Sequence, residues 1–144
     1  MGCHDSKYSR LLPIVLLIGG ISGCSKDYEK EEIDSDIVVW TQTEEAETII
    51  YAGTEKCYSS GAYGINYDQH ISDDHITIKF KNVLNYGVGV AMPCPAYCRI
   101  NLGGLNSGKG YDLLFKLNGI KTIGTITPGA VPEMNLIEEG NVKL

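Results

Sequence analysis

Apolar and polar side chains alternate most regularly over Tyr111–Leu117, where Leu114 is the only exception. A period of two residues is typical of a β-strand with one buried face. The next two residues, Asn118-Gly119, tolerate the positive φ angles that a tight hairpin turn requires. We therefore predict an antiparallel hairpin that returns through Ile120–Thr127 and ends at Pro128, because proline has no N–H for the strand ladder.

Weaker versions of the same pattern predict further strands upstream. His75–Val83 places Ile76, Ile78 and Phe80 on one face and polar residues on the other. The other candidate strands are Asp36–Thr43, Glu47–Ala52, Ala62–Tyr67, Gly87–Met92 and Tyr97–Leu102, and the tail Glu133–Leu144 either adds an edge strand or stays loose. Because no long amphipathic helix stands out, the pattern predicts an all-β fold.

A short motif before the hairpin favours one kind of β-fold. Leu105, Gly108 and Tyr111 form an L-x-x-G-x-x-Y run. It resembles the tyrosine corner of Greek-key β-sandwiches, whose tyrosine hydroxyl hydrogen-bonds to the backbone of the loop that crosses between the sheets. The resemblance implies an immunoglobulin-like or fibronectin-like sandwich of about seven strands. Leu113 stands where antibody domains carry a cysteine, so the fibronectin-like form fits better.

The first 23 residues predict a lipoprotein signal peptide. A short basic segment precedes an apolar run over residues 11–21, which is shorter than the roughly 20 residues of a membrane-spanning helix. Ile21-Ser22-Gly23-Cys24 resembles the bacterial lipobox. That resemblance implies an acylated Cys24 that anchors the protein in a membrane. The alternative is an ordinary secretory leader with an incidental cysteine.

Residues 24–36 predict an acidic, solvated tether, because the run is dense in charge and poor in apolar side chains. The run also resembles the acidic export tag of surface lipoproteins in the Bacteroides group. That resemblance implies a lipid-anchored protein of the outer membrane or cell surface. A periplasm-facing position is the alternative, and both lie outside the cytoplasm.

The remaining residues, 37–144, have room for one β-sandwich domain. The whole chain has 144 residues, with 17 glycines and nine tyrosines, which suit short strands joined by turns. Its net charge of −6 opposes a nucleic-acid partner, because phosphate binding needs a basic face.

Three cysteines follow the leader: Cys57, Cys94 and Cys98. In an oxidising envelope cysteines are expected to pair. We expect a disulfide between Cys57 and one of the later two, with Cys94–Cys98 as the rival pairing. Either arrangement leaves one thiol free or in an intermolecular bond.

No residues predict a metal, a cofactor or catalysis. His70-x4-His75 and Cys94-x3-Cys98 have spacings near those of structural zinc sites, but zinc needs reduced thiols, which this compartment disfavours. No nucleophile signature, oxyanion hole or phosphate-binding glycine loop is evident. We therefore expect a non-catalytic binding protein.

The segment Asn85–Tyr97 is a candidate recognition loop, because glycines allow close approach and prolines stiffen a loop before it binds. Its candidate contact residues are Gly87, Val88, Gly89, Met92, Pro93 and Pro95. The alternative is an edge strand over Gly87–Met92, joined by a short link to the next strand.

The size of the chain, the predicted anchor and the run Ile76–Pro128 resemble small Bacteroides-group lipoproteins encoded beside streptopain-like cysteine proteases and thought to restrain them. That resemblance implies an inhibitor of a secreted cysteine protease, with Gly87–Ala96 in the protease cleft. The alternative is an accessory surface module that binds glycan or protein. Its candidate aromatic platform is Tyr58, Tyr63 and Tyr67, whereas Trp40, a lone tryptophan in an apolar strand, is expected to be a core anchor.

Overall fold

The computed structural model describes residues 28–59, 62–87 and 92–144. These residues form ten β-strands and no helix. The strands are β1 (Glu29–Glu31), β2 (Ile37–Glu44), β3 (Glu47–Tyr58), β4 (Tyr63–Ser72), β5 (His75–Asn85), β6 (Cys94–Asn101), β7 (Tyr111–Leu117), β8 (Ile120–Thr127), β9 (Glu133–Glu138) and β10 (Val142–Lys143). The expected all-β class is confirmed.

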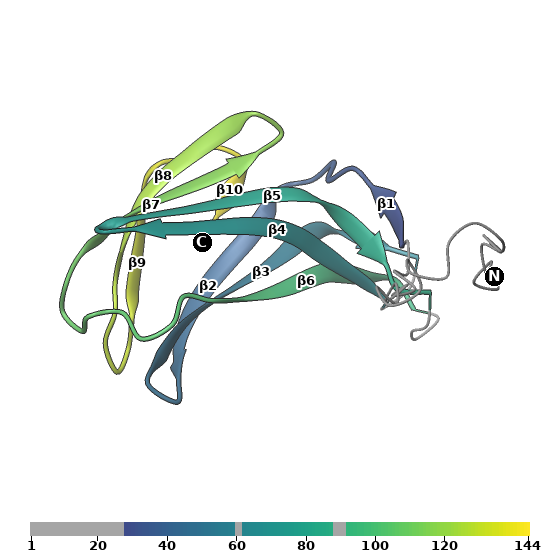
Figure 1. The fold of residues 1–144 in the computed structure, drawn as a ribbon. Coiled ribbons are helices and arrows are strands. Elements are labelled where there is room, and N and C mark those ends of the chain that lie inside the picture. The colour runs from purple at the N-terminus through teal and green to yellow at the C-terminus, as the bar shows by residue number, and fades with distance from the viewer. Residues whose placement is uncertain (1–27, 60–61, 88–91) are drawn as a thin grey trace, which may run out of the picture.

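All ten strands belong to a single sheet that is nearly closed into a barrel (Figure 1). Their order is β10-β2-β3-β6-β4-β5-β7-β8-β9, and β1 pairs with β5 beside this path. The pairs β5–β7, β4–β6 and β10–β2 are parallel, and the others are antiparallel. The immunoglobulin-like sandwich of about seven strands is not confirmed, since the described strands form one sheet and not two.

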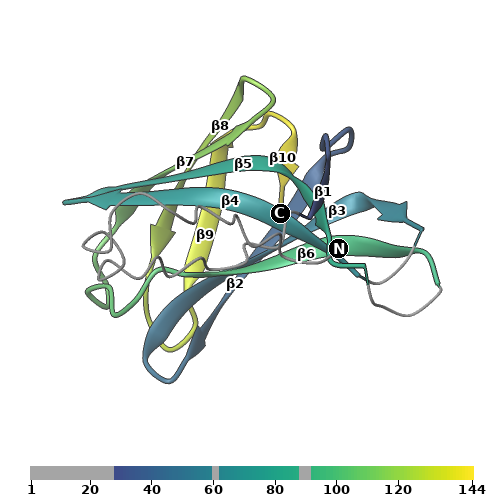
Figure 2. The same cartoon turned by 45° about the vertical axis from the view of Figure 1, so that its right-hand side comes forward.

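The C-terminal segment brings the two edges of the sheet together. β9 and β10 follow one another in the chain but lie at opposite ends of the strand order, which the turned view in Figure 2 helps to follow. Ile37 of β2 donates its N–H to the carbonyl oxygen of Asn141 at 3.0 Å. Thr43 of β2 donates its hydroxyl to the carbonyl oxygen of Gly129 at 2.5 Å. These contacts join β2 to the chain on both sides of β9.

The predicted hairpin forms with the expected bounds, β7 and β8. Asn118 and Gly119 have φ angles of 53° and 76°, as a two-residue turn with both central residues left-handed requires. The predicted alternation also holds, because Leu113, Phe115 and Leu117 are buried in the core. There the ring of Phe115 stacks on Phe80 of β5, with centroids 5.9 Å apart.

The hydrogen bond predicted for Tyr111 is present, although the fold around it is a single sheet and not a sandwich. The hydroxyl of Tyr111 accepts a hydrogen bond from the backbone N–H of Asn106 at 3.1 Å. Gly108 has a φ of 79° and donates its N–H to the carbonyl oxygen of Pro128 at 2.9 Å, while Leu105 packs against the core. The loop leads from β6 past β4 and β5 to β7, within the same sheet. The contact is therefore local and does not by itself specify a two-sheet sandwich.

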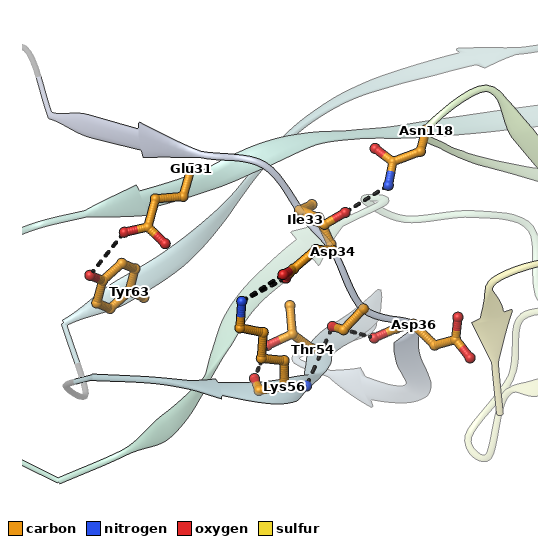
Figure 3. A network of polar contacts seen from close by, with 9 residues as sticks. Glu31, Ile33, Asp34, Asp36, Thr54, Lys56, Tyr63 and Asn118 are labelled. Carbon is orange, nitrogen blue, oxygen red and sulfur yellow. Dashed lines mark hydrogen bonds and ion pairs between the residues drawn. The ribbon is translucent and has the colours of Figure 1, made fainter.

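Part of the predicted tether belongs to the domain. Glu29–Glu31 forms β1 on the edge of β5, and Ile33 is only 1% exposed because its apolar side chain joins the core. Asp34 pairs with Lys56 of β3 at 2.7 Å (Figure 3). The side chains of Glu29–Glu32 are exposed, as expected for a tether, but the backbone of Glu29–Glu31 is paired with β5 and Ile33 is buried. The predicted leader and Cys24 lie outside the described residues.

The described part of the chain contains no helix that is long and apolar enough to cross a membrane.

Candidate functional site

The predicted core anchor, Trp40, lies on the outer surface of the sheet. Ile37 and Val39 of β2 are 0% and 1% exposed, and strand alternation places Trp40 on the opposite side, where it is 41% exposed. The prediction was wrong because the apolar run over β2 hides its period of two. Alternation counted from Ile37 and Val39 would have placed the indole outside.

Two tyrosines from neighbouring strands gather around Trp40. Tyr51 of β3 is its direct cross-strand partner, and their rings stack with centroids 5.5 Å apart and planes 10° apart. Tyr97 of β6 meets Trp40 edge to face, with centroids 6.2 Å apart, and is 52% exposed. We call Trp40, Tyr51 and Tyr97 the aromatic face. Its three rings come from three adjacent strands, so the sheet fixes their spacing.

A glycine seats one of these rings against the sheet. Gly53 of β3 lies directly opposite Tyr97 in the register. A Cβ atom at position 53 would lie 2.7 Å from a carbon of the Tyr97 ring, which is closer than real contacts allow. The missing side chain lets the Tyr97 ring lie across the strand. This long-range pairing carries no signal in the sequence.

Polar side chains brace the edge of the aromatic face. The carboxylate of Glu44 accepts hydrogen bonds from the Tyr51 hydroxyl and the Gln42 amide, and its Oε2 lies 2.6 Å from Nη2 of Arg99. The bonds from Tyr51, Arg99 and Gln42, in that order, lower the pKa of Glu44 to about 2. Glu44 is therefore ionised at neutral pH and holds both Tyr51 and Arg99 in place.

The tyrosines predicted as a platform do not form one. Tyr58 is buried, with 4% of its surface exposed, and Tyr63 stacks on it with centroids 4.9 Å apart. Tyr67 donates its hydroxyl to the carbonyl oxygen of Arg99 at 3.1 Å and packs against the core. These three rings are buried or half-buried against the core. The aromatic face on β2, β3 and β6 is a separate cluster.

Only part of the predicted recognition loop falls in the described chain. Val88 and Gly89 lie outside the described residues. The described members are Gly87, Met92, Pro93 and Pro95. Gly87 has a φ of 77°, Met92 is 61% exposed, and Pro95 lies within β6 and not in a loop.

The three described cysteines are free thiols, so the expected disulfide is absent from the structure. Cys94 and Cys98 lie four residues apart on one extended strand, a separation of about 13 Å at 3.3 Å per residue, whereas a disulfide needs Cα atoms about 6 Å apart. Cys57 lies opposite Pro95 in the register and Cys98 lies opposite Ala52. Cys57 therefore faces neither cysteine across the strands.

The two histidines considered as zinc ligands lie on β4 and β5, near the turn that joins these strands. His75 Nδ1 is 3.2 Å from Oδ2 of Asp112. Among residues 28–59, 62–87 and 92–144, no group of three or more histidine, cysteine, aspartate or glutamate side chains is arranged to hold a metal ion.

Comparisons of this chain with protein-family models, with curated proteins and with solved structures give no match. A functional assignment therefore depends on the geometry of the aromatic face itself.

Proposed function

We propose that this protein is a non-catalytic binding module and that its aromatic face takes carbohydrate. The observation that carries the proposal is the stacking of the exposed Trp40 on the half-buried Tyr51, with the exposed Tyr97 beside them. Large aromatic side chains are expected in the core of a small β domain, and a cluster on the surface marks a contact site.

The chemistry of the face suits a sugar. A pyranose ring has an apolar C–H face that packs on an aromatic ring and a rim of hydroxyls that needs polar partners. Here the rings lie beside Gln42, Glu44 and Arg99, which supply amide, carboxylate and guanidinium groups. Within the aromatic face, Trp40 and Tyr97 are the two exposed rings, at 41% and 52%, and are the residues assigned to stacking.

The face is also held in shape before any ligand arrives. Tyr51 is fixed by the hydrogen bond from its hydroxyl to Glu44, and the Tyr97 ring is packed against Gly53. A site that is already ordered loses little conformational entropy on binding. Weak stacking contacts can then give useful affinity.

The predicted anchor gives this site its setting. An acylated Cys24 would hold the domain outside the cytoplasm, where oligosaccharides are available for capture. The anchor is tested by palmitate labelling, which should mark the wild type and not the Cys24→Ala variant. Restraint of a streptopain-like cysteine protease stays a prediction, since residues 88–91 of its segment lie outside the described chain.

Binding is tested on a printed array of neutral and acidic oligosaccharides, with the full-length protein in a detergent that contains no sugar. Hits are then titrated in solution. Trp40 is the single tryptophan of the chain, so its fluorescence reports ligand contact directly. We expect Trp40→Ala and Tyr97→Ala to abolish the array signal, and Tyr97→Phe, which keeps the ring, to retain it.

The matched control is Tyr28→Ala, since Tyr28 is an exposed aromatic residue that packs on Tyr86, outside the aromatic face. This variant should bind as the wild type does. An array without hits, or hits that persist in both Trp40→Ala and Tyr97→Ala, would remove the carbohydrate proposal.

A further inference from the structure

Three lysines form a straight row across three adjacent strands. Lys79 of β5 pairs in register with Lys116 of β7, and Lys116 pairs with Lys121 of β8. Cross-strand partners in a sheet have Cβ atoms about 5 Å apart, so the three lysine side chains leave the sheet from neighbouring positions on one face. We call these residues the lysine row.

The row is unfavourable in the protein alone. Like charges directly opposite one another destabilise a sheet. Within the described part of the chain, no carboxylate forms an ion pair with any of the three lysines, whereas Lys56, Lys81, Lys109 and Lys143 each have at least one. The nearest acidic register partner is Asp68, opposite Lys79, and its carboxylate lies 3.5 Å from Lys81. This concentration of unpaired positive charge occurs in a chain whose net charge is −6.

A hollow lies beside the row. It has a volume of about 260 Å³ and is lined by the three lysines together with Phe80 and the Asn118-Gly119 turn. No acidic side chain lines it. The turn is fixed by its left-handed residues, and Asn118 is further tied to Ile33. One wall of the hollow is therefore a fixed turn, while none of its three ammonium groups has an ion-pair partner among the residues that the structure describes.

We propose that the lysine row and its hollow bind a multiply charged phosphate group. Three ammonium groups donate up to three hydrogen bonds each, which suits the several oxygens of a phosphomonoester or pyrophosphate. Binding offsets the repulsion among the lysines, so the site gains more from a dianion than isolated surface lysines would. The site lies on β5, β7 and β8, apart from the aromatic face on β2, β3 and β6, and the inference does not depend on the proposed carbohydrate function.

The probes are inorganic pyrophosphate and monomeric dihexanoyl phosphatidic acid, titrated into the full-length protein in a nonionic detergent and followed by calorimetry. Binding of both indicates a site for any terminal phosphate, and binding of the lipid alone indicates a headgroup site. Dihexanoyl phosphatidylcholine, whose phosphate is capped by choline, should not bind. Added salt should weaken both interactions, because it screens exposed charges.

The decisive variant is Lys116→Gln, which removes the central charge of the row. Affinity should fall at least about tenfold, the loss expected for one charge-assisted hydrogen bond. The unfolding midpoint without ligand should stay equal or rise, because a like-charge contact is relieved, and this separates a binding role from a structural one. The matched control is Lys109→Gln, which removes the same charge from the loop before β7, where Lys109 pairs with Asp74.

Absence of wild-type binding to both phosphate probes would overturn the proposal. So would an equal loss of affinity in Lys116→Gln and Lys109→Gln, since that would indicate only a nonspecific response to net charge.

Discussion

The side-chain amide of Asn118 donates a hydrogen bond to the backbone carbonyl of Ile33 at 2.6 Å (Figure 3). The bond joins the β7–β8 turn to the segment between β1 and β2, 85 positions away in the chain. Asn118 thus has two roles, because it also holds the left-handed turn at a φ of 53°. One residue therefore links the most local element of the fold to one of its longest-range contacts.

Replacing Asn118 separates these two roles. Asn118→Gly keeps a residue that tolerates positive φ but leaves the Ile33 carbonyl without its partner. We expect a loss of about 1–3 kcal/mol in unfolding free energy, the cost of an unsatisfied buried acceptor, measured by urea denaturation. Asn118→Asp, which keeps the turn preference but cannot donate, should lose a similar amount. Wild-type stability in both variants would show that the bond contributes nothing.

Ile33 tests whether the N-terminal segment is part of the core. Its side chain is 1% exposed, so Ile33→Ala should lower the unfolding free energy by about 2–5 kcal/mol, as large-to-small core substitutions do. A solvated tether would predict no change. The control is Glu32→Ala, one position away on an exposed side chain, which should leave the denaturation curve almost unchanged.

Thiol labelling distinguishes the described cysteines. Burial raises the pKa of the Cys98 thiol to about 12, so it has almost no reactive thiolate near pH 8, whereas Cys57 is exposed. Iodoacetamide should modify Cys57 in the native protein and Cys98 only after denaturation, as read by peptide mass spectrometry. A disulfide-linked peptide containing Cys57 would contradict the structure.

Glu44 should make stability depend on acid pH. Its pKa falls from 4.5 to about 2 on folding. Between these two pH values the Glu44 carboxylate is ionised in the folded protein but protonated in the unfolded chain. Its stabilising contribution is complete above pH 4.5 and is lost as the pH falls toward 2. Thermal midpoints of wild type and Glu44→Gln should therefore differ at neutral pH and converge in acid.

The charge-matched control for this titration is Glu133→Gln, an exposed glutamate at the start of β9. This variant removes the same charge, so only a change with pH larger than the one it shows is assigned to the contacts of Glu44. A Glu44→Gln curve that runs parallel to the wild type down to pH 2 would contradict the lowered pKa.

Local signals explain what the sequence could predict. The hairpin of β7 and β8 is specified by alternation and by Asn118-Gly119, and the Tyr111 contact closes over five residues. The number of sheets was not accessible in this way, because the parallel pairing of β5 with β7 and of β10 with β2 joins segments far apart in the chain. A tyrosine corner describes one loop and says nothing of these pairings.

The aromatic face was hidden for a related reason. Each of its residues lies on a predicted strand, but the contact between Trp40 and Tyr97 exists only after β3 pairs with both β2 and β6. The β3–β6 register also shifts between Gly53 and Cys57, which alternation in a single sequence cannot reveal. The same shift left the cysteine pairing unpredictable, because it decides which residues oppose Cys57.

Val142 and Lys143 occupy the flank of β2 where a foreign strand would otherwise dock. Val142 is fully buried there, so a peptide that paired with this part of β2 would first have to displace Val142 from the core. The last strand thus covers the first two residues of the β2 edge, where an unpaired strand could template aggregation. Removal of Val142 and Lys143 should therefore expose this edge of β2 to pairing with another chain.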